Sequence, residues 1–96
     1  MKLKGRADKT VTVTKEYAIG PRMGAPDFEW GNMGDGAESL AWSILYQVLR
    51  DVSSASYYSQ EFKRQVVDKF GEEWEITAGT VEAWLAEQRE KERTNR

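Results

Sequence analysis

An amphipathic helical pattern over residues 37–52 constrains the fold of this chain more than any other feature. Its apolar residues recur at three- and four-residue spacing and form one broad stripe: Ala37, Leu40, Ala41, Ile44, Leu45, Val48, Leu49 and Val52. A stripe of this width buries one side of a helix against a core. We therefore expect a central helix over about residues 36–52, with the rest of the chain packed against it.

Two further helices are expected after this one. Aromatic and apolar residues recur every four positions in the next segment: Tyr58, Phe62, Val66 and Phe70. This spacing predicts a helix over about residues 56–70, with Gly71 as the residue that ends it. A third helix is predicted over about residues 78–90, with Thr77 as its N-cap and a frayed tail at residues 91–96.

Short strands are expected before the central helix. Val11 and Val13 alternate with threonines, which is the pattern of a half-buried strand, so residues 2–14 are predicted to form a hairpin. A loop is predicted over residues 15–25, because glycine and proline interrupt every pattern there. Residues 27–30 are predicted to form a third short strand.

A fourth short strand is expected at residues 74–76, just before the third helix. The chain has 96 residues, no internal repeat and no linker, so we expect one domain over residues 1–96. The predicted fold class is α+β, with a small antiparallel N-terminal sheet packed against three helices.

Histidine and cysteine are both absent from the sequence. Their absence removes the common Ser-His-Asp and Cys-His catalytic arrangements and the usual zinc ligands. No apolar run approaches the roughly 18–20 residues that a membrane-spanning helix needs. We therefore expect a non-catalytic, cytoplasmic protein with no cofactor, no metal site and no membrane partner.

The glycine-rich segment GNMGDG, residues 31–36, leads into the central helix. It is not a P-loop, because no Lys-Ser/Thr pair follows its last glycine. The simpler interpretation is that Asp35 caps the helix and that Glu38 reaches back in a capping box. Gly34 and Gly36 are then expected to supply backbone angles that other residues resist.

A weaker alternative is a small metal-dependent hydrolase. Pro26-Asp27 and Glu61-Phe62-Lys63 together repeat the letters of the PD…ExK nuclease pattern. That chemistry requires both acids and the lysine to converge on one metal ion. Within a helix, Glu61 and Lys63 point about 200° apart, which argues against such a site.

The clearest indication of function is aromatic. Trp42 lies about 110° and Tyr46 about 150° from the centre of the apolar stripe, and four residues separate them on a second face of the helix. Tryptophan and tyrosine dominate the binding energy of protein interfaces. We therefore predict a protein-binding surface at Glu29, Asp35, Glu38, Trp42 and Tyr46. The same aromatic patch is equally compatible with a homodimer face. The alternative is that the sheet, the loop over residues 20–36 or the third helix covers both rings.

The stretch FEWGNMGDGAESLAWSIL (residues 28–45), followed by EFKRQVV, WEIT and AWL, resembles a family of small bacterial and phage proteins classed only as a domain of unknown function. The resemblance covers about residues 10–86. The family usually has Gly-Ser-Gly-Pro where this chain has GDGA at residues 34–37. The resemblance implies a compact α+β fold and a frequent home in phages and other mobile elements, and it implies no catalytic residues.

Two functions therefore remain open beside the hydrolase. The first is an accessory protein of phages or mobile elements that binds a host protein or protein complex, in its concrete form an inhibitor of a bacterial defence system such as CRISPR. The second is a nucleic-acid-binding accessory protein that uses the basic N-terminal hairpin. The residues of the second hypothesis are Lys2, Lys4, Arg6 and Lys9.

Overall fold

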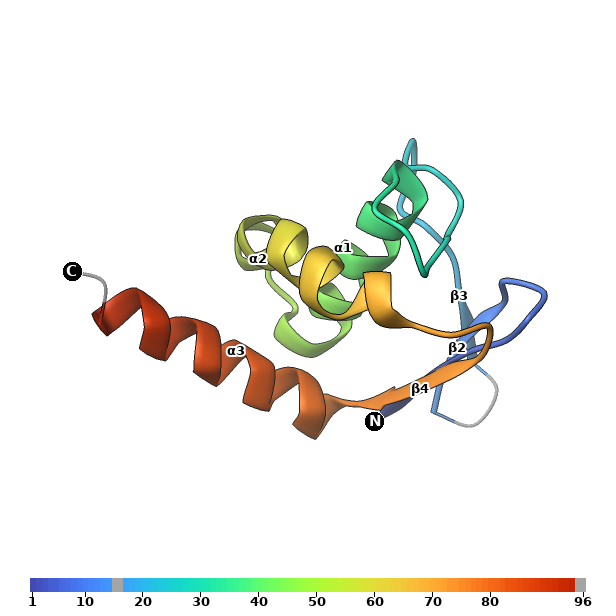
Figure 1. Ribbon diagram of the computed structural model, residues 1–96. Coiled ribbons are helices and arrows are strands. Elements are labelled where there is room, and N and C mark those ends of the chain that lie inside the picture. The colour runs from blue at the N-terminus through green and yellow to red at the C-terminus, as the bar shows by residue number, and fades with distance from the viewer. Residues whose placement is uncertain (15–16, 95–96) are drawn as a thin grey trace.

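The computed structural model describes residues 1–14 and 17–94 (Figure 1). The strands are β1 (Lys2–Gly5), β2 (Val11–Val13), β3 (Tyr17–Ile19) and β4 (Trp74–Thr77). The helices are α1 (Asp35–Leu49), α2 (Val52–Gln65), the short 3₁₀ helix η1 (Val67–Lys69) and α3 (Ala78–Thr94). The predicted α+β fold, with a small antiparallel sheet and three α-helices, is confirmed. Residues 15–16 of the predicted loop and residues 95–96 of the predicted tail lie outside the described residues.

The strands form one antiparallel sheet in the order β3-β2-β1-β4. The strand pairing aligns two rows of side chains across the sheet on the same face: Trp74–Gly5–Val11–Ile19 and Ile76–Leu3–Val13–Tyr17. Most of these residues are buried. The other face carries Lys2, Lys4 and Glu75, which are exposed. One face therefore packs on the core and the other meets solvent, as expected for a small antiparallel sheet.

The third strand differs from the prediction. It is formed by Tyr17–Ile19, inside the segment predicted as a loop, and residues 27–30 form no strand. Phe28 and Trp30 lie in a loop and are both buried in the core, at 5% and 4% exposure, while Glu29 between them is not. The alternation reflects burial of two side chains and not pairing with another strand.

The break between α1 and α2 lies earlier than predicted. α1 ends where Arg50 adopts a left-handed backbone conformation, with φ of 55°. Asp51 then caps α2 by accepting a hydrogen bond from the Ser54 N–H, so Val52 begins α2 and does not complete α1. α2 ends at Gln65 and is followed by η1, so Gly71 does not end it.

The third helix begins where the sequence predicts. The Thr77 hydroxyl accepts a hydrogen bond from the Thr80 N–H at 3.1 Å, which is the N-cap geometry. α3 continues to Thr94, beyond the predicted end at residue 90. In Figure 1, α3 leaves the end of β4 and extends away from the sheet. It gives the molecule its longest dimension, 42 Å against 26 and 25 Å.

The core is centred on α1, as its apolar stripe predicts. The fully buried residues of this helix are Ala37, Leu40, Ala41, Ile44 and Leu45. They meet Leu3 from the sheet, Phe62 from α2 and Val81 from α3, each at 0% exposure. Among the described residues, none of the helices combines the length and apolar character needed to cross a membrane.

Candidate functional site

One face of α1 forms a wall of an open cleft. Asp35, Glu38, Trp42 and Tyr46 follow one another along this face because helical residues three and four apart point the same way. The opposite wall is the end of β3 and the loop that follows it, residues 19–26. We refer to this feature, together with Val52 at its far end, as the α1 cleft.

The α1 cleft has two halves that share Arg22. The acidic half has a volume of about 460 Å³ and lies between residues 22–26 and the first turns of α1, where Asp35 and Glu38 line it. The aromatic half has a volume of about 320 Å³. Its main lining residues are Ile19, Arg22, Trp42, Tyr46, Gln47 and Val52. The cleft thus brings together four of the five residues predicted to bind a protein.

Two arginines and two aromatic rings form a stack along the aromatic half. The rings of Trp42 and Tyr46 are parallel within 6°, with their centroids 5.1 Å apart. The Arg22 guanidinium lies 4.1 Å from the Trp42 ring centroid, and the Arg50 guanidinium lies 5.8 Å from that of Tyr46. Each contact is a cation–π interaction, so each ring of the aromatic wall has an arginine over it.

Trp42 is covered, which is one of the two outcomes that its helix position left open. It is only 8% exposed, and its indole N–H donates to the Ser56 hydroxyl at 3.1 Å. Tyr46 is half-buried. The aromatic surface is therefore the wall of a groove and not a projecting patch. The most exposed aromatic side chain on α1 and α2 is Tyr57, at 68% exposure.

Glu38 joins α1 to α2. Its carboxylate accepts a hydrogen bond from the Ser59 hydroxyl at 2.5 Å and lies 3.6 Å from the Lys63 ammonium group. Ser59 and Lys63 are 2% and 8% exposed, so this polar cluster is largely shielded from water. Ion pairs in such surroundings are strongly coupled to the packing around them. Glu38 therefore lines the cleft while it is held by α2.

The predicted capping box is wrong. The N-cap of α1 is Gly34, which makes no side-chain capping hydrogen bond, and Asp35 is the first helical residue. Glu38 turns toward α2 and does not reach back to the start of its own helix. Both carboxylates still lie in the first turn, where the helix dipole favours negative charge.

The glycines of the turn act differently from the prediction. Gly34 has φ of −78°, which any residue can adopt, and Gly36 does not have a positive φ. Gly36 is needed for close packing, since a Cβ there would lie 2.6 Å from the Asp27 carbonyl oxygen. The residue in the left-handed region is Gly31, with φ of 73°. The preceding loop therefore packs directly against the first turn of α1.

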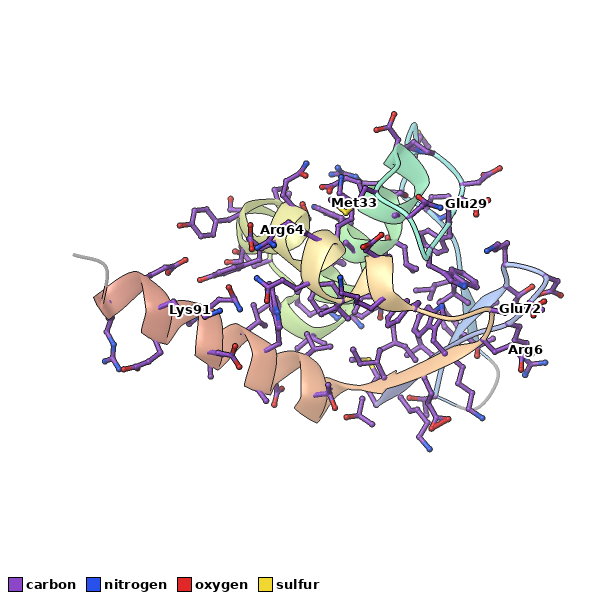
Figure 2. All side chains as sticks on the ribbon, viewed as in Figure 1. Arg6, Glu29, Met33, Arg64, Glu72 and Lys91 are labelled. Atoms are coloured by element: carbon purple, nitrogen blue, oxygen red, sulfur yellow. The ribbon has the colours of Figure 1, made fainter. Side chains whose placement is uncertain are left out.

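Glu29 lies outside the α1 cleft. Its carboxylate is 3.5 Å from the Lys9 ammonium group, which also lies 4.2 Å from the centre of the Trp30 ring. Figure 2 shows Glu29 on the loop before α1. Its contacts link this loop to the β1–β2 hairpin, so Glu29 is the one predicted binding residue that the cleft does not include.

The basic residues of the hairpin are mostly paired. Lys2 and Lys4 both lie close to Glu75, at 3.4 and 3.6 Å, across the open face of the sheet. Lys9 pairs with Glu29. Arg6 forms no ion pair with any residue in the described ranges, and it projects at the sheet end of the molecule (Figure 2). The hairpin therefore presents little unpaired positive charge.

The residues of the PD…ExK pattern do not converge. Glu61 is exposed and accepts hydrogen bonds from Arg64 and Gln65, and the Arg64 interaction is the main cause of its lowered pKa. Lys63 is turned the other way, toward Glu38. Across residues 1–14 and 17–94, no three acidic side chains are grouped so as to hold a metal ion. Nothing in this arrangement supports the hydrolase hypothesis.

Sequence reasoning named the loop over residues 20–36 as one of three possible covers for Trp42 and Tyr46, but it did not identify the residues that line the cleft from that side. Arg22 and Val52 line it, and no local pattern indicates that residues 20–26 fold back over α1. One signal was available for the stack, because Trp42, Tyr46 and Arg50 are spaced four residues apart and therefore share a helix face.

The profile of a family of unknown function, DUF6166, matches residues 4–87. The chain belongs to the DUF6166 family. The match includes the second half of β1, the other three strands, both walls of the α1 cleft and α3 as far as Glu87, so the cleft is built from the family region. Comparisons with curated proteins and with solved structures return no match.

Proposed function

We propose that this DUF6166 protein is a non-catalytic binding protein whose α1 cleft receives part of another protein. The observation that carries this proposal is that Asp35, Glu38, Trp42 and Tyr46 line two adjoining pockets along one face of α1, with Arg22 shared between them. These residues come from three successive turns of one rigid helix. A site built on such an element is preorganised, which lowers the entropy cost of binding.

The composition of the cleft supports a protein partner. Tryptophan, tyrosine and arginine are the residues that most often dominate the binding energy of interfaces, and the stack of Arg22, Trp42 and Tyr46 places all three side by side. Apolar side chains are exposed at its edge, with Met23 at 101% and Val52 at 55%. Apolar groups beside a groove are typical of recognition surfaces.

The resemblance to small phage and bacterial proteins supports a more concrete form of the proposal. In this form the protein is an accessory protein of a phage or mobile element, acts in the bacterial cytoplasm, and binds a host protein. An inhibitor of a bacterial defence system fits these properties. Its mode of action is occupation of a partner surface, which requires no catalytic residue in this chain.

Two experiments test the proposal. Expression of the gene in bacteria that carry a defined defence system should raise the plaque count of a phage restricted by that system. Purified protein with a photo-crosslinking amino acid at Gln47, in the cleft wall, should then label one subunit of the purified defence complex. The same amino acid at Ala86, on the exposed side of α3, is the matched control. Plaque counts unchanged across a panel of such systems, with no labelling from Gln47, would refute the proposal.

The nucleic-acid alternative has less support, because Lys2, Lys4 and Lys9 are already paired with carboxylates. Binding through phosphate contacts would weaken steeply with rising salt. Titration of the protein into labelled DNA and RNA at low salt measures this directly. A salt-sensitive affinity that Arg6→Gln lowers would favour the hairpin over the α1 cleft.

A further inference from the structure

Arg22 and Arg50 occupy equivalent positions at the two ends of the ring stack. Both are exposed, and each lies with its guanidinium over an aromatic ring. Within the described part of the chain, neither forms an ion pair, and the Arg50 guanidinium donates a hydrogen bond to the Gln47 side-chain oxygen at 3.4 Å. A guanidinium stacked by its face keeps its N–H edge available for a carboxylate.

The groove beside the ring stack is apolar, with Arg22 in its lining and Arg50 next to it over the Tyr46 ring. Ile19, Tyr46 and Val52 line it, and the half-exposed Val52 leaves apolar surface at its mouth. β3 ends at this groove and is an edge strand of the sheet. An edge strand beside an apolar groove is a common setting for binding an extended segment of another protein.

We propose, as a deepening of the function proposed above and resting on it, that the aromatic half of the α1 cleft binds an extended partner segment with an acidic residue on each side of an apolar one. The apolar side chain enters the groove beside Tyr46. The two carboxylates pair with Arg22 and Arg50. Charge complementarity at both ends therefore sets the position of the segment along the groove.

The stack also sets an upper limit to the spacing of the two acids, because the distance between the two guanidinium groups cannot exceed the sum of its steps. Its three steps measure 4.1, 5.1 and 5.8 Å, from the Arg22 guanidinium through the two rings to the Arg50 guanidinium. An extended chain advances about 3.3 Å per residue, and alternate side chains share a face. Acidic residues about four positions apart, with the apolar residue midway, then reach both arginines from one face of the segment.

A protein segment fits this groove better than a nucleic acid does. Single-stranded nucleic acids gain affinity by stacking bases on free aromatic faces. Here the facing surfaces of Trp42 and Tyr46 cover each other, and Arg22 and Arg50 lie over the same two rings. The wall beside them is aliphatic, which suits a leucine, isoleucine or phenylalanine side chain.

A random 12-residue peptide library displayed on phage tests the proposal without a known partner. Selection on the wild-type protein should enrich peptides with Asp or Glu, an apolar residue two positions on, and Asp or Glu two positions further. A synthetic peptide of the enriched sequence should lose at least about tenfold in affinity for Arg22→Gln and for Arg50→Gln. Arg6→Gln, an exposed arginine at the far hairpin, should bind like the wild type. Unchanged circular dichroism spectra establish that the variants are folded.

Other results would overturn this inference. Peptides that bind the Gln variants as well as the wild type would place the protein-binding site elsewhere and leave the proposed function standing. Enrichment of basic peptides, or a selection that enriches no peptide, would show that an acidic segment is not the ligand. Displacement of the peptide by oligothymidylate at equal concentration would favour a nucleic acid. Self-association lost in Arg22→Gln and Arg50→Gln, measured by sedimentation, would make a second copy the occupant.

Discussion

The carboxylate of Glu38, in the first turn of α1, faces the ammonium group of Lys63, near the end of α2, at 3.6 Å. The Lys63 side chain is 10% exposed and that of Glu38 is 27% exposed. The pair joins the acidic half of the α1 cleft to the helix behind it. Its removal should therefore affect both the stability of the protein and the shape of the cleft.

Glu38→Gln leaves Lys63 without its opposite charge in a shielded position. Because Glu38 is partly exposed, the expected loss in the free energy of unfolding is about 1–3 kcal/mol, below the range for a fully buried pair. Urea denaturation measures the loss. The double variant Glu38→Gln/Lys63→Met should recover part of it. Glu87→Gln, from the exposed pair with Lys91, is the control and should change stability far less. Equal effects of Glu38→Gln and Glu87→Gln would contradict the prediction.

The variants Gly36→Ala and Gly34→Ala test why the turn contains glycine. Gly36 is required by close packing, whereas neither packing nor backbone conformation requires Gly34. A Cβ on Gly36 would lie 2.6 Å from the Asp27 carbonyl oxygen, so the loop or the helix must shift. The expected loss in the free energy of unfolding is about 1–3 kcal/mol. A Cβ on Gly34 would meet the Asn32 side chain at 3.2 Å, which can move. Gly34→Ala should stay within about 0.5 kcal/mol of the wild type. A larger loss from Gly34→Ala than from Gly36→Ala would disprove this assignment.

The helices were predictable because their patterns report a buried face. The apolar stripe of α1 correctly predicted core residues, and Thr77 was correctly predicted as the N-cap of α3. Both features depend on residues only a few positions apart in the sequence. The end of α1 was placed too late because Val52 continues the apolar spacing although it is 55% exposed. Periodicity alone cannot detect the left-handed turn at Arg50 that separates the two helices.

The third strand and the cleft depend on contacts between distant residues. Tyr17–Ile19 is a strand because it pairs with Val11–Val13, and three residues carry too little pattern to predict that pairing. The helical positions of Trp42 and Tyr46 correctly placed them on one face. Their surroundings could not be predicted, because Arg22 comes from a loop whose path is set by tertiary packing.

Gly5→Ala tests the packing of the Trp74 indole against β1. The Trp74 indole lies so close to Gly5 that an added Cβ would be 2.0 Å from its ring nitrogen. The ring must shift, which disturbs its stacking on Phe70, where the two centroids are 4.3 Å apart. The free energy of unfolding should fall by about 1–3 kcal/mol, and the near-ultraviolet circular dichroism of the tryptophans should change. Gly79→Ala, in α3, is the control and should raise stability by about 0.5–1 kcal/mol. A Gly5→Ala variant with wild-type stability and spectrum would show that the indole has room to move.

The Asp51 cap of α2 predicts a defined dependence of stability on pH. Hydrogen bonds from the Ser54 hydroxyl, at 2.6 Å, and from its backbone N–H, at 2.9 Å, hold the pKa of the Asp51 carboxyl below its ordinary value of 3.8. A lowered native pKa means that this stabilisation is complete above the unfolded-state pKa and is lost as pH falls through the native one. The difference in unfolding free energy between wild type and Asp51→Ala should be constant near neutral pH and should shrink below about pH 4. Urea denaturation at about pH 7 and about pH 2.5 measures it. Asp51→Asn, whose amide oxygen can still accept the N–H bond, is the control that does not titrate. A difference of equal size at both pH values would show that the Asp51 charge does not contribute to capping α2.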